Sequence, residues 1–163
     1  MNKTKLKNMR RFKPQLSLVA KTLGLLLIAL GTVKADQLPS ALKSFEGRIV
    51  YVDFWASWCS PCRRAVPWLN AMQKKYGNST FTIVGVNLDE DRNAANAFLG
   101  EHAVAYPVIF DPSGELARYF EIKGMPSTII LDTAGKELAR HVGFFTDKTD
   151  HYEKTIQAVL AAQ

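Results

Sequence analysis

Two cysteines are the residues whose type and spacing most directly suggest chemistry. The chain has only two, Cys59 and Cys62, and Ser60 and Pro61 separate them. Structural disulfides in exported proteins usually close longer loops, whereas C-x-x-C where a strand leads into a helix is typical of redox work. The pair therefore predicts a redox-active disulfide. The alternative is a closed, inert disulfide.

The expected start of a helix at the cysteines favours Cys59 as the attacking thiol. Only the thiolate attacks a disulfide, and the unpaired N–H groups and positive dipole end of a helix favour the charged form. Arg63 and Arg64 in the first turn either add to this effect or form a solvated polar face. Cys62, one turn further, should lie nearer the interior and attack the mixed disulfide formed by Cys59, an intramolecular step of high effective concentration.

A single acid interrupts the apolar segment before the cysteines. Asp53 lies within residues 49–56 (IVYVDFWA), where loss of hydration should raise the pKa of a carboxyl group. A raised pKa suits proton exchange near neutrality. The alternative is a structural acid, hydrogen-bonded to backbone at the edge of a sheet.

Hydrophobic periodicity predicts the elements that must position these groups. Residues 49–56 form a central strand buried on both faces, and a helix from the cysteines to Gly77 leads to a parallel strand at 81–88. The next elements are a helix at 91–102, a strand at 106–110, a short helix at 115–120, a strand at 127–131 with an antiparallel partner at 137–142, and a helix at 146–162. This is an α/β fold with a central mixed sheet flanked by helices.

The net charge of +6 comes from the start of the chain, not from the expected domain. Residues 1–35 hold eight basic residues and no acid, which leaves 13 basic and 15 acidic residues after Ala35. A basic stretch, an 11-residue apolar run at 23–33 and small or apolar residues at Val33 and Ala35 predict a secretory signal peptide, cleaved before Asp36. The alternative is an uncleaved membrane anchor, although about 20 apolar residues are needed to cross a bilayer. One domain, 36–163, should remain, with no nucleic-acid partner.

The segment Val52-Asp53-Phe54-Trp55-Ala56-Ser57-Trp58-Cys59-Ser60-Pro61-Cys62 closely resembles the active-site segment of thioredoxins. Pro67, five residues after the second cysteine, and Gly124-Met125-Pro126 before a late strand match two further motifs. The leader and the turn at 132–135 look more like the exported TlpA and ResA branch. Two positions depart from relatives: Gly85 stands where thioredoxins carry a lysine, and Ser127 where cytochrome c maturation members usually have a glutamate.

The resemblance implies roles for individual residues. Asp53 would accept the proton of Cys62, and the peptide bond before Pro126 would be cis, so that the backbone of Met125 can pair with an extended substrate segment. Trp58 is expected at the surface as an apolar docking group, and Trp55 mainly in packing. The histidines, at 102, 141 and 151, are expected to be surface residues or to have hydrogen-bond partners.

The predicted function is an exported, periplasmic protein-disulfide oxidoreductase, most simply a reductase, because Ser60 and Pro61 add no positive charge to hold a thiolate. The resemblance implies protein thiol or disulfide substrates, a membrane electron donor of DsbD type, a monomer and no cofactor. The first alternative is a copper carrier, but related copper proteins have C-x-x-x-C. A structural zinc site would need more ligands than two cysteines. A redox-inactive interaction module is the remaining alternative.

Overall fold

The computed structural model describes residues 38–162. The chain divides into two units, Met1–Ala35 and Asp36–Gln163, and the described residues belong to the second. The predicted signal peptide lies outside the described residues, so its cleavage after Ala35 stays a prediction.

A five-stranded mixed sheet forms the centre of the described unit, in the order β3-β2-β1-β4-β5. Strands β1 (Ile49–Trp55), β2 (Phe81–Asn87) and β3 (Val108–Phe110) are parallel, and β4 (Ser127–Leu131) and β5 (Glu137–Val142) are antiparallel to their neighbours. Every residue of β1 is buried, because the strand is central and covered on both faces. The predicted α/β class with a mixed sheet is confirmed.

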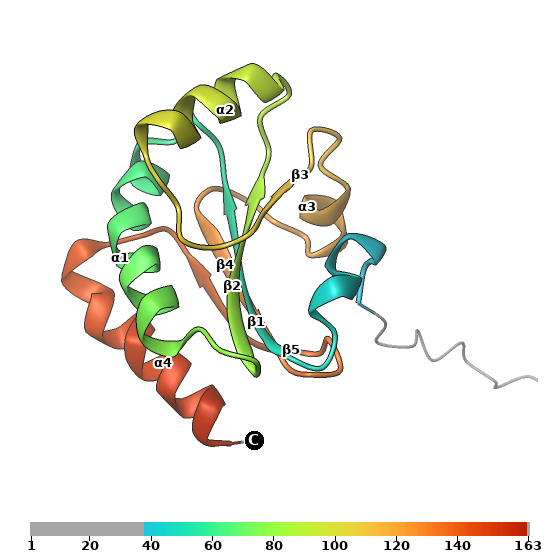
Figure 1. The fold of residues 1–163 in the computed structure, drawn as a ribbon, viewed down its shortest axis with the longest axis vertical. Coiled ribbons are helices and arrows are strands. Elements are labelled where there is room, and N and C mark those ends of the chain that lie inside the picture. Colours follow the sequence, from blue (N-terminus) through green and yellow to red (C-terminus); the bar gives the residue numbers. More distant parts are fainter. Residues whose placement is uncertain (1–37, 163) are drawn as a thin grey trace, which may run out of the picture. The chain divides into compact units, whose positions relative to one another are not determined.

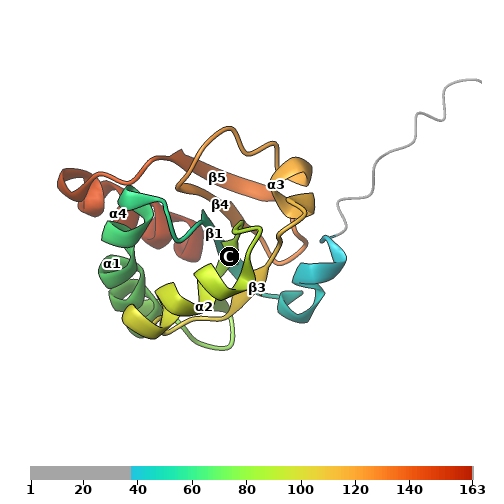
Figure 2. The ribbon, with the colours of Figure 1, turned by 90° about the horizontal axis from the view of Figure 1, so that it is seen from above.

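Helices lie on both faces of this sheet. In Figures 1 and 2, α1 (Ser60–Tyr76) and α4 (Thr149–Ala161) cover one face, and α3 (Glu115–Tyr119) and the 3-10 helix η1 (Ser40–Phe45) cover the other. Helix α2 (Arg92–Glu101) lies near the carboxyl ends of β1 and β2. A short 3-10 helix η2 (Thr146–Lys148) precedes α4.

Local sequence signals explain the two ends of α1. Cys59 is the N-cap residue, Pro61 occupies the first turn, where a missing N–H costs nothing, and Gly77 ends the helix with its N–H bonded to the Gln73 carbonyl oxygen at 2.8 Å. The helix continues through Pro67. One side of it is buried against the sheet, at Cys62, Ala65, Val66, Leu69 and Met72, as the helical spacing predicts.

Some elements differ from the expectation. Residues 40–45, where the sequence analysis places no element, form η1, whose Leu42 is fully buried. The strand expected at 106–110 begins only at Val108, and Tyr106 is a buried residue before it. In α2 the buried residues are Ala95 and Phe98.

Candidate active site

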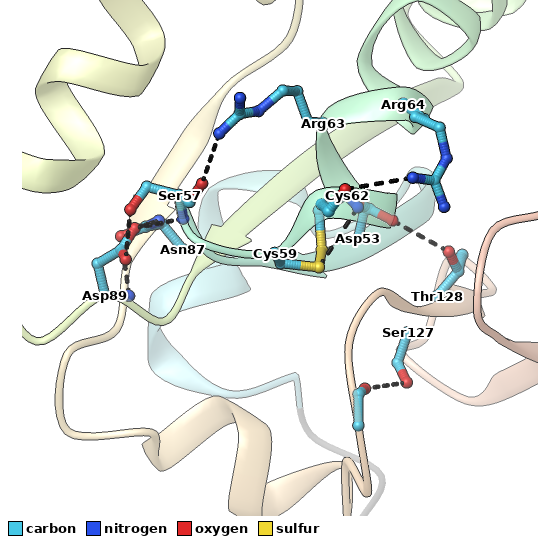
Figure 3. Close-up of a disulfide and its surroundings, with 12 residues drawn as sticks. Asp53, Ser57, Cys59, Cys62, Arg63, Arg64, Asn87, Asp89, Ser127 and Thr128 are labelled. Carbon is cyan, nitrogen blue, oxygen red and sulfur yellow. Dashed lines mark hydrogen bonds between the residues drawn. A yellow bond between two sulfur atoms is a disulfide. The ribbon is translucent and has the colours of Figure 1, made fainter.

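The disulfide lies where β1 leads into α1 (Figure 3). Cys59 and Cys62 are joined, with their Cα atoms 5.3 Å apart. The backbone N–H of Cys62 donates a hydrogen bond to the Cys59 sulfur at 3.3 Å, so this sulfur occupies the position of a helix-capping acceptor. Cys59 is 5% exposed and Cys62 is 2% exposed, so Cys59 is the more exposed cysteine, as expected, although the difference is small.

A polar network holds the loop before the disulfide to the end of β2. The carboxylate of Asp89 accepts hydrogen bonds from the backbone N–H and the hydroxyl of Ser57, both at 2.9 Å, and from the side-chain amide of Asn87 at 2.6 Å. Asn87 and Asp89 are buried, so each bond also satisfies a group removed from water. The Cys59 N–H then donates to the Ala56 carbonyl oxygen at 3.0 Å. This network, which the sequence analysis missed, fixes the approach of the chain to Cys59.

The guanidinium groups of the two arginines in the first turn bond to oxygen atoms and not to the Cys59 sulfur. Arg63 donates to the Ser57 carbonyl oxygen at 3.4 Å, and Arg64 donates to the Ser60 hydroxyl at 3.2 Å (Figure 3). Both bonds are exposed to solvent. The two arginines therefore form a solvated polar face. The hydrogen bond to the Cys59 sulfur comes from the backbone N–H of Cys62, which is a neutral group.

The two tryptophans of the segment have different environments, as expected. Trp58 is 70% exposed beside the disulfide, whereas Trp55 is buried and its ring centroid lies 4.7 Å from that of Phe98. A Cβ atom at Gly85 would lie 3.0 Å from the indole nitrogen of Trp55 and 3.2 Å from the Tyr106 ring. The absence of a side chain at Gly85, where thioredoxins have lysine, therefore gives the Trp55 ring its space.

The late proline motif lies against the same site. The peptide bond between Met125 and Pro126 is cis, as expected. Met125 is partly buried and packs against the apolar cluster that contains Cys59 and Cys62. No hydrogen bond of the Met125 backbone is found within the described residues, whereas the Pro126 carbonyl oxygen accepts from the Gly143 N–H at 2.8 Å.

Asp53 is buried in the middle of the sheet, on the face toward α1. Burial raises the pKa of its carboxyl group to about 7, and a hydrogen bond from the Thr128 hydroxyl, at 3.2 Å, opposes part of this shift. The expected direction of the pKa shift is confirmed, and the edge-of-sheet alternative is wrong because β1 is the central strand. Asp53 shares a small cavity with Pro126 and with Ala65, which lies three residues after Cys62 in α1.

The expectation for the histidines holds only for His151, which is exposed. His102 and His141 each have one buried ring nitrogen without a hydrogen-bond partner among the described residues. Within the same part of the chain, no group of three or more His, Cys, Asp or Glu residues is arranged to hold a metal ion. None of the helices described is long and apolar enough to cross a membrane.

Comparison with known proteins agrees with this geometry. The profile of the Redoxin family matches residues 11–160. The chain belongs to the Redoxin family. Among curated redoxin relatives, thiol-disulfide oxidoreductase ResA of Bacillus thuringiensis subsp. konkukian is 29% identical over 116 residues, 71% of this chain and 67% of the relative. Thioredoxin-like protein YneN of Bacillus subtilis is 33% identical over 112 residues, 67% of this chain and 65% of the relative. The chain thus spans about two thirds of the length of these relatives.

Solved structures of redoxin-like proteins show the same fold. The crystal structure of a Chlorobium tepidum protein described as thiol:disulfide interchange protein DsbE superposes with a TM-score of 0.70 at 44% identity, over 73% of this chain and 84% of that one. A DsbF homologue from Corynebacterium diphtheriae gives a TM-score of 0.64 at 28% identity, over 72% and 75% of the two chains. This redoxin is therefore a thioredoxin-like thiol-disulfide oxidoreductase of ResA and TlpA type, which acts on protein thiols.

Proposed function

We propose that this redoxin is exported to the periplasm and there reduces protein disulfides through the Cys59 and Cys62 dithiol. The observation that carries the proposal is the disulfide at the start of α1 together with a buried acid whose pKa is raised to about 7. Such an acid can take a proton from a thiol and return it to solvent near neutral pH.

The reaction follows from these positions. The Cys59 thiolate attacks a substrate disulfide, forms a mixed disulfide and releases one substrate thiolate. Cys62 then gives its proton to Asp53, attacks the Cys59 sulfur and releases the second substrate thiolate, which takes a proton from water. The substrate has gained two electrons, and Cys59 and Cys62 end as the disulfide seen here.

The environment of Cys59 supports the reducing direction. A strong oxidant needs a thiolate that is unusually stable in the reduced protein. The Cys59 sulfur has one neutral N–H partner, and both nearby arginines bond to oxygen atoms of other residues. Among the described residues no charged group is hydrogen-bonded to this sulfur, which favours a reducing couple.

Three residues beside the disulfide would hold the substrate. The backbone of Met125, which has no hydrogen-bond partner among the described residues, would pair with an extended segment of the substrate by strand addition. The exposed ring of Trp58 would cover apolar side chains of that segment. The domain would work as a monomer, and a membrane protein of DsbD type would restore the dithiol.

A redox titration tests the direction. Equilibration with glutathione should give a potential nearer the roughly −270 mV of thioredoxin than the roughly −120 mV of DsbA. Arg63→Gln serves as a matched variant, because removing a charge that holds no thiolate should leave the potential unchanged. A wild-type potential above about −170 mV would refute the reducing role.

Trapping in cells tests the assignment of the cysteines and the location. A Cys62→Ser variant should accumulate mixed disulfides through Cys59, and a Cys59→Ser variant should accumulate far fewer. The trapped species should be in the periplasmic fraction, with Asp36 as their first residue. Trapping mainly through Cys62, or an intact Met1 in the membrane fraction, would contradict the assignment of roles or of cleavage respectively.

A further inference from the structure

A row of polar residues crosses the sheet from Asp53 to its outer strand. Asp53 of β1 lies directly opposite Thr128 of β4, and Thr128 lies directly opposite His141 of β5. Side chains of directly paired residues project from the same face of a sheet, about 5 Å apart. The three side chains therefore form a line from the buried centre of the sheet to its edge, under α1 and α4.

These three side chains line one small cavity. It leaves about 10 Å³ for the centre of a water molecule, and its wall also includes Pro126 and the rings of Tyr51 and Tyr152. A space of this size holds about one water, provided that two or more polar groups surround it. The Asp53 carboxyl, the Thr128 hydroxyl and the His141 imidazole meet this condition.

His141 has an unused hydrogen-bonding atom. Its Nε2 is fully buried and has no partner among the described residues, although buried ring nitrogens are normally bonded. The ring is half-buried, and its centroid lies 5.8 Å from that of the exposed His151 on α4. His141 thus joins the buried cavity to a group in contact with solvent.

We propose that one water molecule in this cavity bridges Asp53 and His141, and that the proton taken from Cys62 leaves Asp53 by this route. The proposal rests on the role of Asp53 given above. The protonated carboxyl donates to the water, the water donates another of its protons to Nε2 of His141, and the imidazolium releases a proton from Nδ1 to solvent or to His151. Asp53 returns to the carboxylate and His141 to a neutral ring, whose remaining proton moves from Nε2 back to Nδ1 by exchange with solvent before the next cycle.

The groups around His141 favour its neutral form, so that it can accept a proton and release it again. Burial and the neighbouring His151 lower the pKa of His141, so the imidazole is neutral near pH 7 and can accept. Tyr51 on β1 and Tyr152 on α4 are the other titratable groups that line the cavity, and burial raises the pKa of Tyr51 so that it stays neutral. From α1 only Ala65 and Leu69 reach the cavity, and neither titrates.

Stopped-flow kinetics with a peptide disulfide separates the proposal from the role of Asp53. Asp53→Asn should slow resolution of the mixed disulfide and not its formation. His141→Gln, which keeps a polar side chain but cannot carry a proton, should slow the same step by about 100-fold, the lower end of the range for general acid–base effects. His141→Ala should be slow as well, and added imidazole should restore its rate without accelerating the wild type.

His102→Gln is the matched control, because His102 also has a buried, unpartnered ring nitrogen but does not line the cavity. Its resolution rate should equal that of the wild type. Slow resolution in Asp53→Asn with a normal rate in His141→Gln would overturn the relay alone. A normal rate in Asp53→Asn would overturn the role of Asp53 and the relay together.

A measurement on the unmodified protein covers the case in which the His141 variants do not fold. Nitrogen NMR should show Nε2 of neutral His141 without a proton, and its chemical shift should follow the titration of Asp53. A proton on Nε2 of the neutral ring, or a shift insensitive to Asp53, would overturn the proposal.

Discussion

The two faces of β1 are equally buried but differ in the polarity of their side chains. Toward α3 and η1 the strand presents Val50, Val52 and Phe54, which are fully buried in an apolar cluster. Toward α1 and α4 it presents Tyr51, Asp53 and Trp55, with a cavity at Asp53. Burial therefore does not separate structural from chemical positions in this strand. The two faces differ because the Asp53 carboxyl group lines a cavity large enough for about one water, whereas Val50, Val52 and Phe54 pack in an apolar cluster.

The apolar face should give the largest effect on stability. Phe54 is fully buried, and its ring packs edge to face against Phe120 with centroids 6.0 Å apart. Phe54→Ala should lower the free energy of unfolding by about 3–5 kcal/mol, because it removes apolar contacts and leaves a cavity. Urea denaturation of the oxidised protein measures this. The redox potential of the folded fraction should stay the same, and a large shift would mean that this face also tunes the disulfide.

Asp53→Asn on the opposite face should stabilise the protein. The pKa of Asp53 is raised to about 7 in the folded state, so the folded protein binds more protons than the unfolded chain between about pH 4 and 7. The wild type therefore loses stability as the pH rises through this range, and the amide variant does not. Above pH 7 the variant should be more stable by about 2–4 kcal/mol. Urea denaturation at several pH values checks this, and a gain equal at pH 4 and pH 8 would contradict it.

Removing one hydroxyl should change the pKa of Asp53 without changing the shape of the core. Thr128→Val deletes the donor that stabilises the Asp53 carboxylate, so the pKa should rise further and the protein should lose about 1 kcal/mol above pH 7. Carbon NMR of the carboxyl group measures the pKa. Thr82→Val is the control, because Thr82 is paired with Val50 and lies on the apolar face. An equal shift of the Asp53 pKa in both variants would mean that the Thr128 hydroxyl has no specific effect on this carboxyl group.

Trp58→Ala should change stability least. The ring is 70% exposed, so the free energy of unfolding should change by no more than about 0.5 kcal/mol. If Trp58 contacts the substrate, KM for a peptide disulfide should rise while the pKa of Asp53 stays constant. An unchanged KM would remove Trp58 from the substrate surface.

Local patterns were sufficient to predict part of this site. The apolar run of β1, the helix that begins at the cysteines and the strand at Ser127–Leu131 follow from periodicity and from Pro and Gly positions. The raised pKa of Asp53 follows from its position in a buried strand, which needs no knowledge of its partners. The cis bond at Pro126 came from the family resemblance.

Contacts between distant segments could not be predicted in the same way. Asp89 follows β2 by two residues, and its bonds to Ser57 depend on how the ends of two parallel strands meet. His141 faces Thr128 only because of the register of the last hairpin, and a shift of one residue would turn it to the other side of the sheet. The expectation for His141 failed because its surroundings come from β1, β4 and α4.

The hydrogen bonds from Ser57 to Asp89 limit how far a change at the disulfide can spread. The segment before Cys59 is tied to the residues after β2, and those residues are themselves bonded to Asn87 and to the Trp55 carbonyl oxygen. When the sulfur–sulfur bond opens, we therefore expect the adjustment to stay within the first turn of α1. The reduced and oxidised proteins should share one backbone, so each cycle of electron transfer involves little structural reorganisation and the substrate meets the same surface in both states.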